Sequence, residues 1–330
     1  MRAAIFHGKE DIRIDQVPDP EIQAPTDAII RITRTAICGS DLWFYRGLQD
    51  YKPGSRTGHE PMGIVEEVGA EVEGLTPGDL VLAPFAISDG TCEFCQHGIH
   101  TSCNHGGFWA GITDGAQGQF VRAPLADGTL VRVPEDVHGD EAMLDALFPL
   151  TDVMGTGHHA AVCAGVEPGA TVVVIGDGAV GLCGVLAAHR LGAARIIAVG
   201  HHTARLELAR RFGATDVVSS RGDAATGEIL DMTEGGARHV LECVGGSLNT
   251  GVGDRCHRRF LAGVVVRECT TRVAGQLCDL VDHEPVQAAL LRQAKGSLGK
   301  RLCRRRTLPL PQALGHDHSL PGTCPTGKIA

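Results

Sequence analysis

The sequence is poor in aromatic side chains and lacks a long hydrophobic run. Phe, Trp and Tyr make up 4% of its 330 residues. Apolar runs such as TVVVI, residues 171–175, stop after a few residues, whereas a membrane-spanning helix needs about 20 mainly apolar residues. No segment has the pattern of a secretory leader either. We therefore expect no membrane segment and a cytoplasmic location.

Aromatic residues are also scarce around the basic clusters of the last part of the chain. The net charge is −9, but residues 248–330 hold 13 Lys and Arg against 6 Asp and Glu. Clusters such as KRLCRRR, residues 300–306, contain no aromatic residue and match no recognisable nucleic-acid-binding motif. We expect no nucleic-acid partner.

What the chain does contain favours two domains. An apolar content of 43% over 330 residues is enough for a large core. Up to residue 153, short β-type runs are broken by Gly and Pro, which predicts a β-rich, barrel-like domain. From residue 154, apolar strands alternate with amphipathic helices, which predicts a doubly wound parallel sheet. The twelve cysteines of a cytoplasmic chain are expected to be reduced thiols or metal ligands.

A glycine-rich turn marks a dinucleotide site. The stretch VVVIGDGAVG places Gly176, Gly178 and Gly181 in a G-x-G-x-x-G pattern, with Ala179 and Val180 before the last glycine. The pattern follows an apolar strand and precedes a helix, so the turn can bring backbone N–H groups close to a pyrophosphate. The alternative is an ordinary glycine-rich turn between a strand and a helix.

The second strand of this unit indicates which dinucleotide binds. NAD sites usually carry an acidic residue at its end, which accepts hydrogen bonds from the ribose hydroxyls. Here the strand RIIAV is followed by GHHTAR, with Gly200 at the acidic position and His201, His202 and Arg205 beyond it. The space at Gly200 and the hydrogen-bond donors of the two histidines and Arg205 would suit a 2′-phosphate. NADP(H) is therefore favoured over NAD. The alternative is that the two histidines are exposed loop residues.

Possible zinc ligands are scattered through the β-rich half. Cys38 lies in ICGSD, His59 and Glu60 lie in GHEPMG, and Asp152 lies in PLTDVMGTG. Taken singly, each has a structural explanation, such as a core thiol or a helix N-cap. Together with the nucleotide motif, they resemble the zinc-dependent alcohol dehydrogenases of the medium-chain dehydrogenase/reductase family. The resemblance covers nearly all of residues 1–247.

This resemblance implies roles for particular residues. Cys38, His59 and Asp152 match the protein ligands of the family's catalytic zinc, and Glu60 matches a nearby carboxylate that can exchange with them. Such a set leaves one coordination position for an alcohol, while the nicotinamide accepts the hydride. Ser40 matches the hydroxyl of the proton relay.

The chain departs from the family pattern at one position of the relay. Trp43 stands where many relatives carry a histidine of the relay or the pocket. The last proton step is then expected to use another route, in a narrower and more apolar pocket.

A second zinc site is expected in the stretch SDGTCEFCQHGIHTSC, residues 88–103. The family's structural-zinc lobe has four ligands, and counting back from Cys103 through Cys95 and Cys92 reaches Asp89 at the first position. Aspartate is an accepted zinc ligand. We expect these four residues to order the lobe; the alternative is a lobe that has lost its metal.

The resemblance stops after residue 247. It implies a GroES-like catalytic domain over 1–153, a Rossmann domain over 154–294 and a segment, 295–330, that returns to the catalytic domain. The gain of Arg and Cys after 247 is typical of diverged or frameshifted coding sequence. The expected activity is hydride transfer between a primary or secondary alcohol and NADP(H), in a homodimer or homotetramer. The alternative is a catalytically impaired protein that binds zinc and nucleotide.

Overall fold

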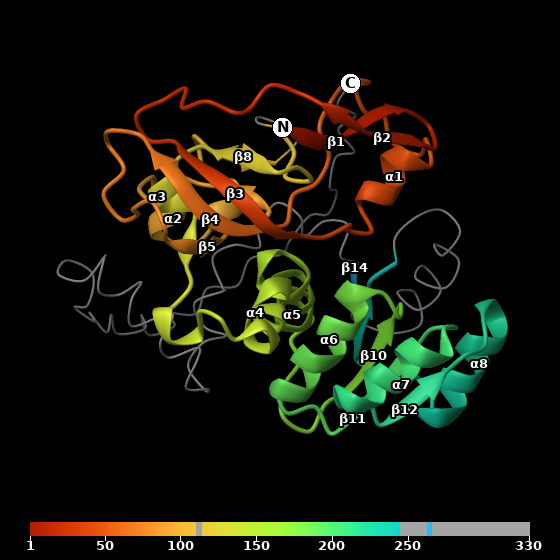
Figure 1. Cartoon of the computed structure of the whole chain (residues 1–330). Helices are drawn as coiled ribbons and strands as arrows, with labels where there is room; N and C mark the ends of the chain where they lie inside the picture. The colour runs from red at the N-terminus through yellow and green to blue at the C-terminus, as the bar shows by residue number, and fades with distance from the viewer. Residues whose placement is uncertain (110–113, 245–262, 266–330) are drawn as a thin grey trace, which may run out of the picture.

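The computed structural model describes residues 1–109, 114–244 and the backbone of 263–265. Figure 1 shows two lobes, one rich in strands and one in which helices cover a sheet. The predicted fold class, a β-rich domain followed by a doubly wound parallel sheet, is confirmed. The boundaries 1–153, 154–294 and 295–330 stay a prediction, and what was predicted for 266–330 lies outside the described residues.

An antiparallel five-stranded sheet forms the centre of the β-rich lobe, in the order β8-β3-β4-β5-β9. Its strands are β3 (Ala28–Thr35), β4 (Pro61–Val68), β5 (Leu80–Leu82), β8 (Phe120–Ala123) and β9 (Val131–Arg132). Ile30, Val65, Val81 and Val121 are almost completely buried in one cluster. The alternation of apolar and polar residues along short strands therefore gives the sheet one face toward the core.

Smaller elements surround this sheet. They comprise the hairpins β1 (Arg2–Gly8) with β2 (Asp11–Gln16) and β6 (Ala86–Ile87) with β7 (Gly107–Phe108), and short helices at α1 (Asp41–Tyr45), α2 (Glu93–Gln96), η1 (His100–Ser102), α3 (Ala126–Thr129) and η2 (Glu135–Val137). Helices α1 and α2 each begin within three residues of a cysteine predicted to bind zinc, and so fix the cysteines in space.

The second lobe contains a parallel sheet in the order β12-β11-β10-β13-β14. Its elements are β10 (Thr171–Ile175), α6 (Ala179–Arg190), β11 (Arg195–Val199), α7 (Thr203–Arg211), β12 (Asp216–Val218), α8 (Gly222–Met232), β13 (His239–Glu242) and β14 (Gly263–Val265). The strand order reverses between β10 and β13, and ligands of such sheets bind at the carboxyl ends of the strands at this point.

Helices cover both faces of this sheet, which explains why its strands are continuous runs of apolar residues. Val172 and Val174 pack with α6 and α7 on one face. Val173 and Ile175 pack with α8 on the other. Successive residues of β10 therefore enter different cores.

The two lobes are joined through α4 (Glu141–Leu147), η3 (Phe148–Thr151) and α5 (Val153–Cys163). Helix α5 is buried along most of its length and packs on α6, where a Cβ at Gly157 would lie 2.6 Å from the backbone nitrogen of Gly184. The close approach of these helices fixes the start of α5, where Asp152 lies. Among the residues that the structure describes, no helix combines the length and the apolar content needed to cross a bilayer.

Candidate metal and cofactor sites

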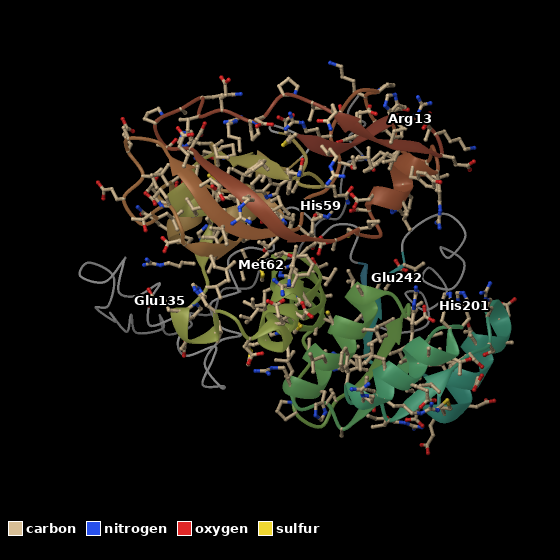
Figure 2. The ribbon with its side chains drawn as sticks, in the orientation of Figure 1. Arg13, His59, Met62, Glu135, His201 and Glu242 are labelled. Atoms are coloured by element: carbon tan, nitrogen blue, oxygen red, sulfur yellow. The ribbon has the colours of Figure 1, made fainter. Side chains whose placement is uncertain are left out.

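Four residues predicted near the catalytic zinc come together between the lobes. Cys38 follows β3, His59 and Glu60 precede β4, and Asp152 precedes α5. Their ligand atoms all lie within 4.8 Å of one another. The Oδ2 atom of Asp152 is 3.1 Å from Nε2 of His59 and 3.6 Å from Sγ of Cys38. Figure 2 shows His59 on the side of the β-rich lobe that faces the helical lobe.

The charges of this cluster suit a divalent cation. Glu60 is 3% exposed, and burial, together with the nearby charge of Asp152, raises the pKa of its carboxyl group to about 7. Thiol, imidazole and carboxylate are the donor types that zinc takes in proteins. A cation would compensate the carboxylates that are buried around His59, so the residues present fit a zinc ion.

Asp41 is a residue of this site that the sequence analysis missed. It is 5% exposed, and its Oδ1 atom lies 3.4 Å from Nδ1 of His59. Its Oδ2 atom accepts hydrogen bonds from the backbone N–H of Cys38, at 3.0 Å, and from Nε2 of Gln117, at 3.2 Å. A carboxylate on one imidazole nitrogen orients the other nitrogen toward a metal. The sequence could have indicated this residue, because Asp41 is the last residue of the CGSD motif that contains Cys38.

Ser40 and Trp43 lie beside the cluster, on α1. Ser40 is exposed, occupies the N-cap position of the helix and lies two residues from Cys38. Among the described residues, no hydrogen bond joins its hydroxyl to the four possible ligands. Trp43, in the first turn of α1, is half-buried. The placement of Ser40 leaves its hydroxyl open to solvent.

The second predicted zinc cluster is also assembled. Ligand atoms of Asp89, Cys92, Cys95 and Cys103 all lie within 4.8 Å of one another. The Sγ atom of Cys92 is 3.6 Å from that of Cys95 and 3.9 Å from that of Cys103. These separations exclude disulfide bonds, which require about 2.05 Å. Three thiols and a carboxylate that converge on one point fit a tetrahedral zinc ion.

Asp89 is fixed by its own hydrogen bonds. Its Oδ1 atom accepts the backbone N–H groups of Thr91, at 2.8 Å, and Cys92, at 2.9 Å. Its Oδ2 atom is 2.6 Å from Nδ1 of the exposed His105. Burial by itself would raise the pKa of the Asp89 carboxyl group. The hydrogen bonds from the backbone N–H of Cys92 and from the imidazole of His105 outweigh burial, and they hold this pKa well below its usual range. Asp89 is therefore a carboxylate, the form that binds a metal.

The glycine-rich turn after β10 has the shape that a pyrophosphate requires. Gly176 has a φ of +116°, and a Cβ at Gly181 would lie 1.9 Å from the carbonyl oxygen of Gly176. A Cβ at Gly178 would meet nothing within 4 Å, so this residue faces open space at the N-cap of α6. Ala179 and Val180 form the first turn of that helix. The turn leaves a cradle at the helix N-terminus that suits an anion.

The end of β11 differs from the sequence-based expectation. The segment GHHTAR itself contains no carboxylate, as the sequence analysis states, but the structure brings one there from another loop. Asp177, from the glycine-rich turn, lies against Gly200, and its Oδ2 atom accepts the backbone N–H groups of His201, at 2.9 Å, and His202, at 2.8 Å. Arg205 places Nη1 3.8 Å from Oδ1 of the same side chain. Sequence reasoning missed this acid because it comes from another loop.

Both parts of the chain match known families. Residues 24–135 match the alcohol dehydrogenase GroES-like domain, and residues 179–252 match the zinc-binding dehydrogenase family. The zinc dependent alcohol dehydrogenase 2 of Streptococcus pneumonia has a similar structure, with a TM-score of 0.71 and 32% identity over 91% of this chain and 87% of that one.

Curated relatives extend over most of the chain. An uncharacterised zinc-type alcohol dehydrogenase-like protein of Bacillus subtilis is 36% identical over 263 residues, which are 74% of this chain and 68% of that protein. The NADP-dependent isopropanol dehydrogenase of Thermoanaerobacter brockii is 36% identical over 229 residues, 68% of this chain and 63% of that protein. With the GroES-like and Rossmann-type folds, these matches show that the chain belongs to the zinc-dependent alcohol dehydrogenases of the medium-chain dehydrogenase/reductase family.

Proposed function

We propose that the protein transfers hydride between a primary or secondary alcohol and NADP(H), giving the corresponding aldehyde or ketone. Its family is one of oxidoreductases. The observation that carries the proposal is the convergence of Cys38, His59 and Asp152, which come from three separate parts of the chain and whose ligand atoms lie within 4.8 Å of one another. Three protein ligands of these types would leave the fourth coordination position of a zinc ion for a substrate oxygen.

Each residue of the cluster then has a task. Cys38, His59 and Asp152 would hold zinc, which when bound polarises the alcohol oxygen and so assists hydride loss to the nicotinamide. Glu60 lies 3.9 Å from Nε2 of His59, near enough to exchange with a ligand. Ser40, exposed to solvent, would pass the released proton to water.

The second cluster, Asp89, Cys92, Cys95 and Cys103, would hold a structural zinc. A closed set of four protein ligands leaves no position for a substrate. The ion would therefore order residues 88–103 rather than take part in hydride transfer.

The choice of NADP(H) over NAD rests on the end of β11. His201, His202 and Arg205 are exposed there, and a guanidinium with an imidazole can donate to a 2′-phosphate. The name of the Thermoanaerobacter brockii relative includes NADP, which supports the proposal. A cytoplasmic location and a homodimer or homotetramer belong to the same proposal, and sedimentation of the full chain tests the assembly.

Substitution of one cysteine tests the catalytic site. Cys38→Ser is expected to lose the catalytic zinc and nearly all alcohol oxidation, because serine is a poor zinc ligand. Cys163→Ser is the matched control, since Cys163 is an exposed thiol on α5 outside both clusters. Zinc content and NADPH formation would be measured on both variants. Full activity in Cys38→Ser would reject the assignment.

A further inference from the structure

Two histidines and an aspartate outside the two zinc clusters lie close together at one end of the parallel sheet. Asp177 belongs to the turn after β10, and His201 and His202 belong to the loop after β11. One ligand atom of each residue lies within 4.8 Å of the ligand atoms of the other two. The parallel pairing of β10 with β11 brings these two loops together.

The carboxylate of Asp177 is fixed in place by the second loop. It is 8% exposed, and its Oδ2 atom accepts the backbone N–H groups of His201, at 2.9 Å, and His202, at 2.8 Å. Burial by itself would raise the pKa of the Asp177 carboxyl group, but these hydrogen bonds outweigh burial and lower it. Its other oxygen, Oδ1, lies 3.1 Å from Nδ1 of the His202 imidazole. An ionised oxygen is therefore held beside a ring nitrogen.

The two imidazoles lie side by side next to this carboxylate. Their ring centroids are 3.9 Å apart, and both histidines are exposed. Rotation about the χ angles can therefore direct one nitrogen of each ring to a common point. Zinc bonds of 2.0–2.1 Å place tetrahedral ligand atoms about 3.3 Å apart, which is close to the 3.1 Å between Nδ1 of His202 and Oδ1 of Asp177.

Arg205 is a cation beside this cluster, and its charge opposes the binding of a metal ion. Its Nη1 atom lies 3.8 Å from Oδ1 of Asp177. The arginine side chain is 52% exposed, so the guanidinium can turn into solvent when an ion takes its place. Because like charges repel, removal of the guanidinium should strengthen metal binding at this point.

We propose that Asp177, His201 and His202 form a third metal site, for a divalent ion of the zinc class, and that this ion competes with the dinucleotide. Imidazole and carboxylate are donors that such ions accept. Asp177 directly precedes Gly178, where the turn faces open space at the carboxyl end of β10. An ion there would occupy the side chains that face the adenosine end of a bound dinucleotide. The competition, unlike the metal site itself, rests on the proposed function, in which this turn binds the cofactor.

Titration of Zn²⁺ into the full chain with both zinc clusters loaded, followed by calorimetry without cofactor or alcohol, tests the metal site. We expect one further ion per chain in the parent. Its affinity should fall by about tenfold or more in His201→Ala and in His202→Ala, since even outer partners of metal ligands change affinity by this amount, and rise in Arg205→Ala. His7→Ala is the control, because it removes an exposed imidazole beside a single carboxylate, that of Asp15. No further ion in the parent, or equal binding by the His201 and His202 variants, would overturn the site.

Titration of NADP⁺ at rising Zn²⁺ concentration tests the competition. The apparent Kd of NADP⁺ should rise in the parent, by about tenfold once free Zn²⁺ is at about ten times the Kd of the site. The rise should be much smaller in His201→Ala, which also corrects for zinc that binds to the cofactor itself. An equal rise in parent and variant, or tighter NADP⁺ binding with Zn²⁺, would overturn the competition. A parent that binds no dinucleotide would count against the proposed function, while the titration of Zn²⁺ alone still judges the metal site.

Discussion

At the scale of single residues, the geometry of His59 depends on the carboxylates around it. Asp41 contacts Nδ1, at 3.4 Å, and Asp152 contacts Nε2, at 3.1 Å. Asp41 also accepts the backbone N–H of Cys38, so one carboxylate orients two of the proposed zinc ligands. Outer partners of this kind are known to affect metal affinity strongly.

Replacement of Asp41 should therefore weaken the catalytic zinc without removing a ligand. We expect Asp41→Asn to lower zinc affinity at this site by about 10- to 100-fold, measured by competition with a chelator. Asp50→Asn, at an exposed aspartate, is the control. Unchanged affinity in Asp41→Asn would show that the contact with His59 does not orient the imidazole.

Tyr51 gives a residue-scale prediction on pH. Its hydroxyl donates to the carbonyl oxygen of Arg56 at 2.7 Å, and its ring stacks on Phe44 at 4.4 Å. Burial, and then the charge of Asp41, raise the pKa of Tyr51 to about 12. Since the pKa is raised on folding, the stability that this group contributes is present below about pH 10 and is lost as the pH rises toward 12.

Absorbance of tyrosinate can follow this titration. The chain has two tyrosines, so Tyr45→Phe leaves Tyr51 as the single one. Ionisation of Tyr51 is expected near pH 12 in the folded variant. Ionisation near the ordinary value of about 10 would mean that the ring is open to water.

At the scale of elements, the close contact of α5 and α6 determines where Asp152 lies. A Cβ at Gly157 would meet the backbone of Gly184 at 2.6 Å, so Gly157→Ala must push the helices apart. We expect a loss of about 1–3 kcal/mol in the free energy of unfolding. Gly227→Ala, in α8, meets nothing within 4 Å and should instead stabilise by about 0.5–1 kcal/mol. Urea unfolding of both variants checks the opposite signs; equal effects would contradict this account.

The loop 88–103 is the element that most needs its metal. Cys95→Ser is expected to release about one zinc ion per chain and to lower the melting temperature by several degrees, because the ligands supply the order of the loop. Activity should fall only as this loop loses its structure. A folded parent that holds at most one zinc ion would refute the site built on Asp89.

Elements with local patterns could be predicted, and contacts between distant segments could not. The glycine-rich turn and the cysteine spacing are local. In the structure the turn leaves open space at Gly178, and the ligand atoms of Cys92, Cys95 and Cys103 lie within 4.8 Å of one another. Asp177 and Gly200 are 23 positions apart, and their contact depends on the parallel pairing of β10 with β11. The position of Asp177 beside His201 therefore could not be predicted from either motif by itself. Strand β14 was not predicted either, because its run of three residues, GVV, is too short for a periodic pattern to identify a strand.

At the scale of the whole molecule, the proposed activity needs both lobes. The β-rich lobe supplies Cys38 and His59, the junction before α5 supplies Asp152, and the parallel sheet supplies the cradle at Gly178. Asp152 of the first cluster directly precedes α5, and the glycine-rich turn directly precedes α6. These two helices pack together. Hydride transfer thus depends on how these two helices join the lobes.

The most direct test is the reduction of NADP⁺ by the zinc-loaded full chain with short primary and secondary alcohols, followed by the absorbance of the reduced nicotinamide. The account predicts alcohol-dependent NADPH formation by the parent and its loss in His59→Ala, with the melting temperature nearly unchanged. No reduction by a parent that holds both zinc ions, or undiminished reduction by His59→Ala, would contradict it.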